Sequence, residues 1–172
     1  IGSLARTVPL VLINRDISGV PRVLIDAGQG MAEAVTHLSS IGHRRIAYVG
    51  GPSNSWANEQ RRNAVVRAAR KSGVSLDEVN AGTASFASGE QIVDKLLRLS
   101  TSACIAFDDV LAQGICYGLA KRNMVIPSDY SVIGCDDIPG YPLLTTVSSP
   151  SADAGRIAVE MLISSLKSDL DP

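Results

Sequence analysis

The stretch Ile46-Ala47-Tyr48-Val49 is apolar at every position, and Ala103-Cys104-Ile105-Ala106-Phe107 has the same character further along the chain. A strand with one face in water alternates apolar and polar residues, whereas a strand covered on both faces by helices is apolar throughout. The two stretches therefore predict strands in the interior of a parallel sheet.

Short β-branched runs alternate with longer amphipathic runs on either side of these strands. We expect strands at residues 8–14, 22–26, 45–50, 79–86, 103–107, 131–135 and 145–148. We expect helices at residues 30–41, 58–72, 88–99, 110–123 and 152–167. In the second helix Val65, Ala68 and Ala69 lie on one face, as in a helix that packs against a core. This order predicts an α/β protein with parallel sheets flanked by helices.

The composition is that of a globular protein without a strongly charged partner. Of 172 residues, 45% are hydrophobic and 19% are charged. The formal net charge of −1 gives the chain no overall attraction to nucleic acid or to an anionic membrane. No apolar run is long enough to cross a bilayer, and the first residues do not resemble a secretion signal. The three cysteines lack metal-type spacing and are expected to be reduced, which predicts a cytoplasmic location.

Polar and aromatic residues follow the predicted strands. In open parallel sheets, ligands bind beyond the carboxyl ends of the strands. Carboxylates and amides exchange hydrogen bonds with adjacent hydroxyls, a guanidinium bridges two oxygens, and an aromatic ring offers a stacking face. These side chains suit a neutral polyhydroxylated ligand. They are Asp26, Trp56, Asn58, Arg61, Phe86, Asp108, Asp109, Asp136 and Asp137.

Some of these residues also have a purely structural interpretation. An aspartate between a strand and a helix often caps the helix, so capping and ligand contact both remain open for Asp109. Capping or loop bracing is the alternative for Asp137, and covering an edge of the core is the alternative for Trp56.

Signals for other chemistries are weak. Gly28-Gln29-Gly30 continues to Glu33, where a dinucleotide fingerprint requires Gly or Ala. The two histidines lack a second ligand at a useful spacing for a metal. No serine lies in a Gly-x-Ser-x-Gly elbow, and no histidine is placed to activate Cys135. We therefore expect no catalytic residue, metal or cofactor. The rival hypothesis is an enzyme that uses Asp109 or Asp136.

Longer blocks resemble the LacI/GalR repressor family. Residues 42–52, GHRRIAYVGGP, resemble its "GHRRIAxIGG" block, and residues 106–114, AFDDVLAQG, resemble "AxNDxxAxG". Residues 126–139, IPSDYSVIGCDDIP, resemble "VPxDVSVIGFDDIP". Arg61 follows at the spacing of the family's effector-contacting arginine. The blocks cover nearly the whole chain in the family's order.

The resemblance implies a periplasmic-binding-protein-like fold with an effector in the cleft between two lobes. Residues 1–44 would form part of the amino-terminal lobe, residues 45–138 a nearly complete carboxyl-terminal lobe, and residues 139–172 a return segment shared by both. The implied function is the effector-binding and dimerisation core of a DNA-binding transcriptional regulator, with a sugar-like effector and a homodimer. Operator DNA would bind only through a headpiece that this chain lacks. The alternative is a periplasmic-type solute-binding protein for sugar uptake.

Carried over to this sequence, the effector contacts are Asp26, Arg61, Phe86, Asp109 and Asp136, followed by Trp56 and Asn58. The sequence departs from the family at Asp108, where most members have Asn, and at Ala27, where many have Asn. The family also places the helix after Asp109 near the subunit interface. The apolar residues of that helix serve either the interface or the core; they are Leu111, Ile115 and Leu119.

Overall fold

A computed structural model describes residues 7–168, which divide into two compact units. The larger unit, residues 27–149, is called the sheet unit below. The smaller comprises the described residues of segments 1–26 and 150–172 and is called the strand-pair unit.

The sheet unit is built on five parallel strands in the order β4-β3-β5-β6-β7. The strands are β3 (Arg45–Gly50), β4 (Ser75–Asn80), β5 (Ala103–Ala106), β6 (Ser131–Asp136) and β7 (Thr145–Ser148). The helices between them are α1 (Gly28–Ser40), α2 (Trp56–Ser72), α3 (Phe86–Arg98) and α4 (Asp109–Ala120).

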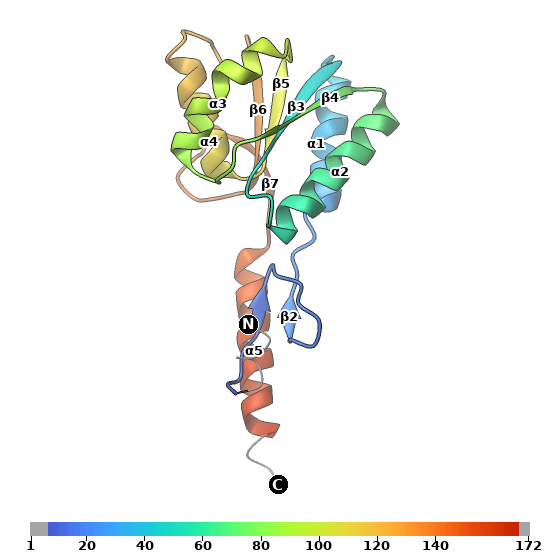
Figure 1. Ribbon diagram of the computed structural model, residues 1–172, viewed down its shortest axis with the longest axis vertical. Coiled ribbons are helices and arrows are strands. Elements are labelled where there is room, and N and C mark those ends of the chain that lie inside the picture. The colour runs from blue at the N-terminus through green and yellow to red at the C-terminus, as the bar shows by residue number, and fades with distance from the viewer. Residues whose placement is uncertain (1–6, 169–172) are drawn as a thin grey trace. The chain divides into compact units, whose positions relative to one another are not determined.

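Helices cover both faces of this sheet, α1 and α2 on one side and α3 and α4 on the other (Figure 1). Along β3, Ile46 and Tyr48 belong to the core shared with α1 and α2. Ala47 and Val49 belong to the core shared with α3 and α4. Burial on both faces explains why the strand is apolar at every position and confirms the predicted α/β class.

The predicted position of the fourth strand is wrong. Residues 79–86 were expected to form it, but β4 spans Ser75–Asn80 and α3 begins at Phe86. Gly73 adopts a left-handed conformation with φ 66° and ends α2, so the chain turns into β4 at once. The strand lies at the sheet edge, where Asp77 pairs with Arg45 at 2.7 Å. Charged residues are common in edge strands and weaken the sequence signal.

The apolar face of α4 is part of the core. Leu111, Ile115 and Leu119 are fully buried beside α3 and the sheet. The structure therefore supports the core alternative for these three side chains and not the interface one.

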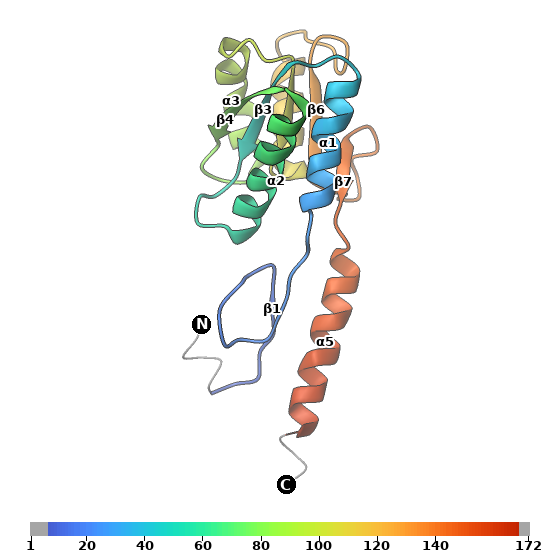
Figure 2. The same cartoon turned by 90° about the vertical axis from the view of Figure 1, so that its right-hand side faces the viewer.

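The strand-pair unit contains β1 (Leu12–Ile13), β2 (Arg22–Val23) and α5 (Ser151–Ser168). The two strands run parallel, and α5 contacts both of them. Figure 2 shows α5 as the long helix that follows β7. Both strands are shorter than the predicted ranges 8–14 and 22–26. The helix α5 leaves several apolar side chains exposed, namely Ile157, Val159, Ile163 and Leu166.

The unit boundaries differ from the expected lobes. Helix α1 packs against α2, and β7 pairs with β6, so both elements lie in the sheet unit. Their apolar side chains complete the core on one face of the sheet. Within residues 7–168, no helix is both long and apolar enough to span a membrane.

Candidate functional site

The carboxyl ends of β3, β5 and β6 lie at one edge of the sheet because these strands are parallel. The chain leaves β3 through residues 51–55 into α2, and leaves β5 through residues 107–108 into α4. These short connections bring side chains from separate parts of the sequence to the same edge.

Arg61 of α2 and Asp136 at the end of β6 form an ion pair at this edge. Arg61 Nη2 lies 2.5 Å from Asp136 Oδ1, and Nη1 donates to the Phe107 carbonyl at 2.5 Å. The Arg61 side chain is only 6% exposed, whereas that of Asp136 is 31% exposed. The guanidinium is thus held by the protein, and the carboxylate keeps a surface that a ligand can reach.

Phe107 fixes the other side of Arg61. The guanidinium carbon lies 4.8 Å from the centre of the Phe107 ring, within the range of a cation–π contact. The ring also lies against Gly51, where an added Cβ would be 2.5 Å from Cδ1 of Phe107. The loop after β3 therefore needs glycine at this point to leave room for the ring that supports Arg61.

Asp136 is held in an unusual backbone conformation. Its φ is 116°, and that of the following Asp137 is 56°. Ser149 Oγ donates to Asp136 Oδ1 at 2.9 Å, on the same oxygen that meets Arg61. Residues other than glycine pay a conformational cost at such angles and keep them only where the surroundings enforce them. Here the bonds to Arg61 and Ser149 supply that enforcement.

The two adjacent carboxylates at the start of α4, Asp108 and Asp109, have different structural roles. Asp108 caps the helix, since its Oδ1 accepts a hydrogen bond from Leu111 N at 2.8 Å. Burial raises the pKa of the Asp108 carboxyl, the bond from Leu111 lowers it, and the nearby charge of Asp136 raises it further, with a net upward shift.

Asp109 is buried, and both of its carboxylate oxygens accept hydrogen bonds from the protein. Its Oδ2 accepts from Ile138 N at 2.8 Å, and its Oδ1 accepts from Thr146 Oγ1 at 2.6 Å. It therefore braces the loop between β6 and β7. Capping was one of the two alternatives left open for Asp109, beside ligand contact, but the cap of α4 is Asp108.

Asn58 also braces the scaffold. Its buried Oδ1 accepts hydrogen bonds from Tyr48 Oη at 3.0 Å and from Gly51 N at 3.1 Å. These bonds hold the loop after β3 against α2. Trp56 is the first residue of this helix and is half-buried, next to Ser55, whose Oγ accepts from Asn58 N.

Two further predicted residues are Phe86 and Asp26. Phe86 is the first residue of α3 and is 41% exposed. Its ring packs against Tyr117 of α4 with 5.3 Å between ring centres. Asp26 is exposed and belongs to the strand-pair unit.

The structure thus pairs Arg61 with Asp136 and adds Phe107 as a contact of Arg61. Asp108, which the sequence already singled out, follows Phe107 directly. The contact of Phe107 with Arg61 was not predicted from the sequence. It involves the backbone carbonyl of Phe107 as well as its ring. The place of Phe107 directly after a buried strand was the available signal. Asp108 differed from the family pattern, and that difference was the signal for it.

Two further observations concern Cys135 and groups of metal-ligating side chains. Burial raises the pKa of the Cys135 thiol to about 11, so it is protonated at neutral pH. Among residues 7–168, no three His, Cys, Asp or Glu side chains gather in a group that could hold a metal ion.

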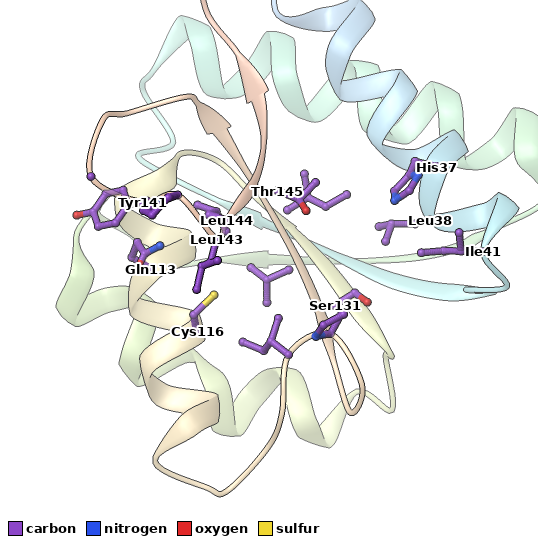
Figure 3. A pocket seen from close by; sticks show the side chains of 16 residues that line it. His37, Leu38, Ile41, Gln113, Cys116, Ser131, Tyr141, Leu143, Leu144 and Thr145 are labelled. Carbon is purple, nitrogen blue, oxygen red and sulfur yellow. The ribbon is translucent and has the colours of Figure 1, made fainter.

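The sheet unit also has an apolar groove of about 550 Å³. Gln113 and Cys116 of α4 line it together with Tyr141, Leu143 and Leu144, which lie in the loop before β7 (Figure 3). None of the predicted effector contacts lines it. Leu143 is 98% exposed beside the groove.

Comparisons with known proteins agree on one family. Residues 35–172 match the model of the periplasmic binding protein-like domain. The chain is 33% identical to the HTH-type transcriptional regulator GalS of Salmonella typhimurium, over 94% of this chain and 51% of that protein. It is 29% identical to the HTH-type transcriptional repressor CytR of Escherichia coli K12, over 92% of this chain and 50% of that protein.

Solved structures give the same result. A LacI transcriptional regulator from a Rhodococcus species superposes with a TM-score of 0.88 at 29% identity, covering 96% of this chain and 65% of that one. A LacI family regulator from Enterococcus faecium with bound ribose superposes with a TM-score of 0.85 at 27% identity, covering 98% of this chain and 66% of that one. The chain spans about half the length of the curated relatives it matches.

Proposed function

The chain belongs to the periplasmic binding protein-like domain family, and we propose that it is the effector-binding and dimerisation core of a LacI-type transcriptional regulator. The effector is a sugar-like small molecule that reaches the edge of the sheet formed by Arg61 and Asp136. The observation that carries this proposal is the buried Arg61 guanidinium, fixed 2.5 Å from a carboxylate that remains 31% exposed.

This arrangement suits a polyhydroxylated ligand. The Asp136 carboxylate is oriented by Arg61 and Ser149 before any ligand arrives, so it loses little freedom when it accepts hydrogen bonds from hydroxyls. The half-buried ring of Trp56 offers an apolar face at the start of α2. Asp109 and Asn58 support this site through the loops and are not effector contacts in the proposal.

The regulator is favoured over a solute-binding protein for uptake and over an enzyme. The relatives named above are transcriptional regulators or repressors. The protonated thiol of Cys135 and the internal use of both Asp109 oxygens also leave few groups for catalysis. A cytoplasmic location follows from the proposed role at operator DNA, which a headpiece outside this chain would bind.

The homodimer belongs to the same proposal, and we place the second copy on the apolar groove. The family resemblance puts α4 near the subunit interface. Gln113 and Cys116 of this helix line the groove, whereas Leu111 on the same helix is buried in the core. The exposed Leu143 adds an apolar side chain that a second copy would cover.

Calorimetry of the full-length protein against monosaccharides, nucleosides and purines tests the proposed function. Binding of one class, weakened in Arg61→Ala by at least about 1 kcal/mol because Arg61 no longer orients the Asp136 carboxylate that accepts the ligand's hydrogen bonds, supports it. Turnover of the bound molecule would instead favour an enzyme. A ligand that binds wild type and Arg61→Ala equally would remove this edge of the sheet from consideration.

A further inference from the structure

The cation at the candidate site is already neutralised. Arg61 meets Asp136 at 2.5 Å and the Phe107 carbonyl at 2.5 Å, and its side chain is 6% exposed. An incoming anion would have to displace the Asp136 carboxylate from the buried guanidinium, and the displaced carboxylate would lose its charged partner. Arg61 is therefore not available as a receptor for a second anion.

The helix end at this edge is occupied as well. The amino terminus of a helix is a ready site for phosphate and carboxylate groups. In α4 that place is taken by Asp108, whose Oδ1 accepts from Leu111 N at 2.8 Å. Its neighbour Asp109 adds a second negative charge in the first turn of the same helix.

The sum of these charges is negative. Asp108 is acted on by the charges of Arg61, Asp109 and Asp136, of which one is positive and two are negative. The Asp136 charge is matched by Arg61, whereas Asp108 forms no ion pair with any side chain of residues 7–168. Family members with Asn at the position of Asp108 would lack this charge.

We propose that this edge of the sheet rejects anionic effectors and accepts uncharged or amino-bearing polyhydroxylated molecules, with Asp108 as the residue that sets this selectivity. The inference rests on the proposed function, because it concerns the effector of that same site. It excludes sugar phosphates and sugar acids as effectors and favours free sugars, amino sugars or nucleosides.

Calorimetry with matched probes tests the selectivity on the full-length protein. The probes are galactose, galactosamine and galacturonate, which differ little in size, together with ribose and ribose 5-phosphate. We expect an uncharged or amino-bearing probe to bind, and its anionic counterpart to bind at least about tenfold more weakly because like charges are brought together. Added salt should narrow this ratio, which it would not do if size caused the discrimination.

Asp108→Asn removes the charge and keeps a side chain that caps helices well. We expect the dissociation constants of the anionic and the uncharged probe to differ at least about threefold less in this variant than in wild type, because a charge repulsion is lost. Asp94→Asn is the matched control. Asp94 lies on α3 and forms an exposed ion pair with Arg122, so this variant also removes one carboxylate. It should leave the ratio unchanged.

The outcomes separate this inference from the proposed function. An anionic probe that binds wild type as tightly as its uncharged counterpart overturns the selectivity and leaves the effector site in place. If Asp108→Asn and Asp94→Asn change the ratio of the two dissociation constants equally, the role given to Asp108 is overturned. If no sugar, nucleoside or purine binds at all, the proposed function fails and the inference fails with it.

Discussion

Arg61 Nη2 and Asp136 Oδ1 lie 2.5 Å apart, although the two residues are on different elements, α2 and the end of β6. The pair ties the helix after β3 to the carboxyl end of another strand. The same contact orients the Asp136 carboxylate, which stays partly open to solvent. The interaction therefore has consequences for stability as well as for ligand binding.

Replacement of Arg61 by Ala should lower the free energy of unfolding by about 1–3 kcal/mol, because charge-assisted hydrogen bonds to Asp136 and to the Phe107 carbonyl are lost. Urea denaturation followed by circular dichroism measures this change. Arg62→Ala is the control on the same helix. Arg62 forms an exposed ion pair with Glu78, so its removal should cost no more than about 1 kcal/mol. Equal losses in the two variants would contradict the structural role given to Arg61.

Thr146→Val should destabilise the sheet unit through Asp109. The change removes the hydroxyl that donates to Asp109 Oδ1 at 2.6 Å and leaves a buried carboxylate oxygen without its donor. We expect a loss of about 1–3 kcal/mol in the free energy of unfolding. Thr145→Val is the control, because Thr145 is its exposed neighbour on β7. A neutral effect of Thr146→Val would mean that Asp109 does not depend on this bond.

The interior strands and most helices could be predicted from the sequence because burial on both faces leaves a direct trace. Ile46 and Ala47 point to opposite cores, so neither face of β3 tolerates a polar residue. The edge strand β4 leaves no such trace. Asp77 and Glu78 lie within it, because their ion pairs with Arg45 and Arg62 make charged residues acceptable there. Neither pairing can be read from positions so far apart in the chain.

The site could be predicted only in part, for a similar reason. The family pattern supplied Arg61 and Asp136, and the structure brings them together. It could not decide between Asp108 and Asp109, since adjacent residues at a helix start differ by their direction alone. One caps the helix through Leu111 N, and the other turns to the loop after β6.

The stability of Asp108→Asn relative to wild type should depend on pH. Because folding raises the pKa of Asp108, the folded protein holds that proton more tightly than the unfolded chain. The resulting stabilisation is complete below the ordinary pKa of 3.8 and is lost as the pH rises through the raised value. The advantage of Asp108→Asn over wild type should therefore grow from acid towards neutral pH. Urea titrations of both proteins across this range measure it, and a constant difference would contradict the shift.

Leu143→Asp should weaken the proposed dimer. Burying a leucine side chain contributes about 1.5–3 kcal/mol, so placing a carboxylate there should raise the dimer dissociation constant at least about tenfold. Sedimentation velocity of the full-length protein at several concentrations measures this constant. Ala87→Asp is the control, because it adds the same charge at an exposed position of α3. Unchanged association in Leu143→Asp would exclude the groove as the contact surface.

The exposed apolar side chains of α5 have a practical consequence for anyone who produces this 172-residue chain by itself. Val159 is 55% exposed and Ile163 is 46% exposed, on a helix that packs against the two short strands β1 and β2. Exposed apolar surfaces of this kind promote association between molecules in water. We expect the isolated chain to self-associate through this helix, and particle mass measured with and without detergent would distinguish that association from an ordered assembly.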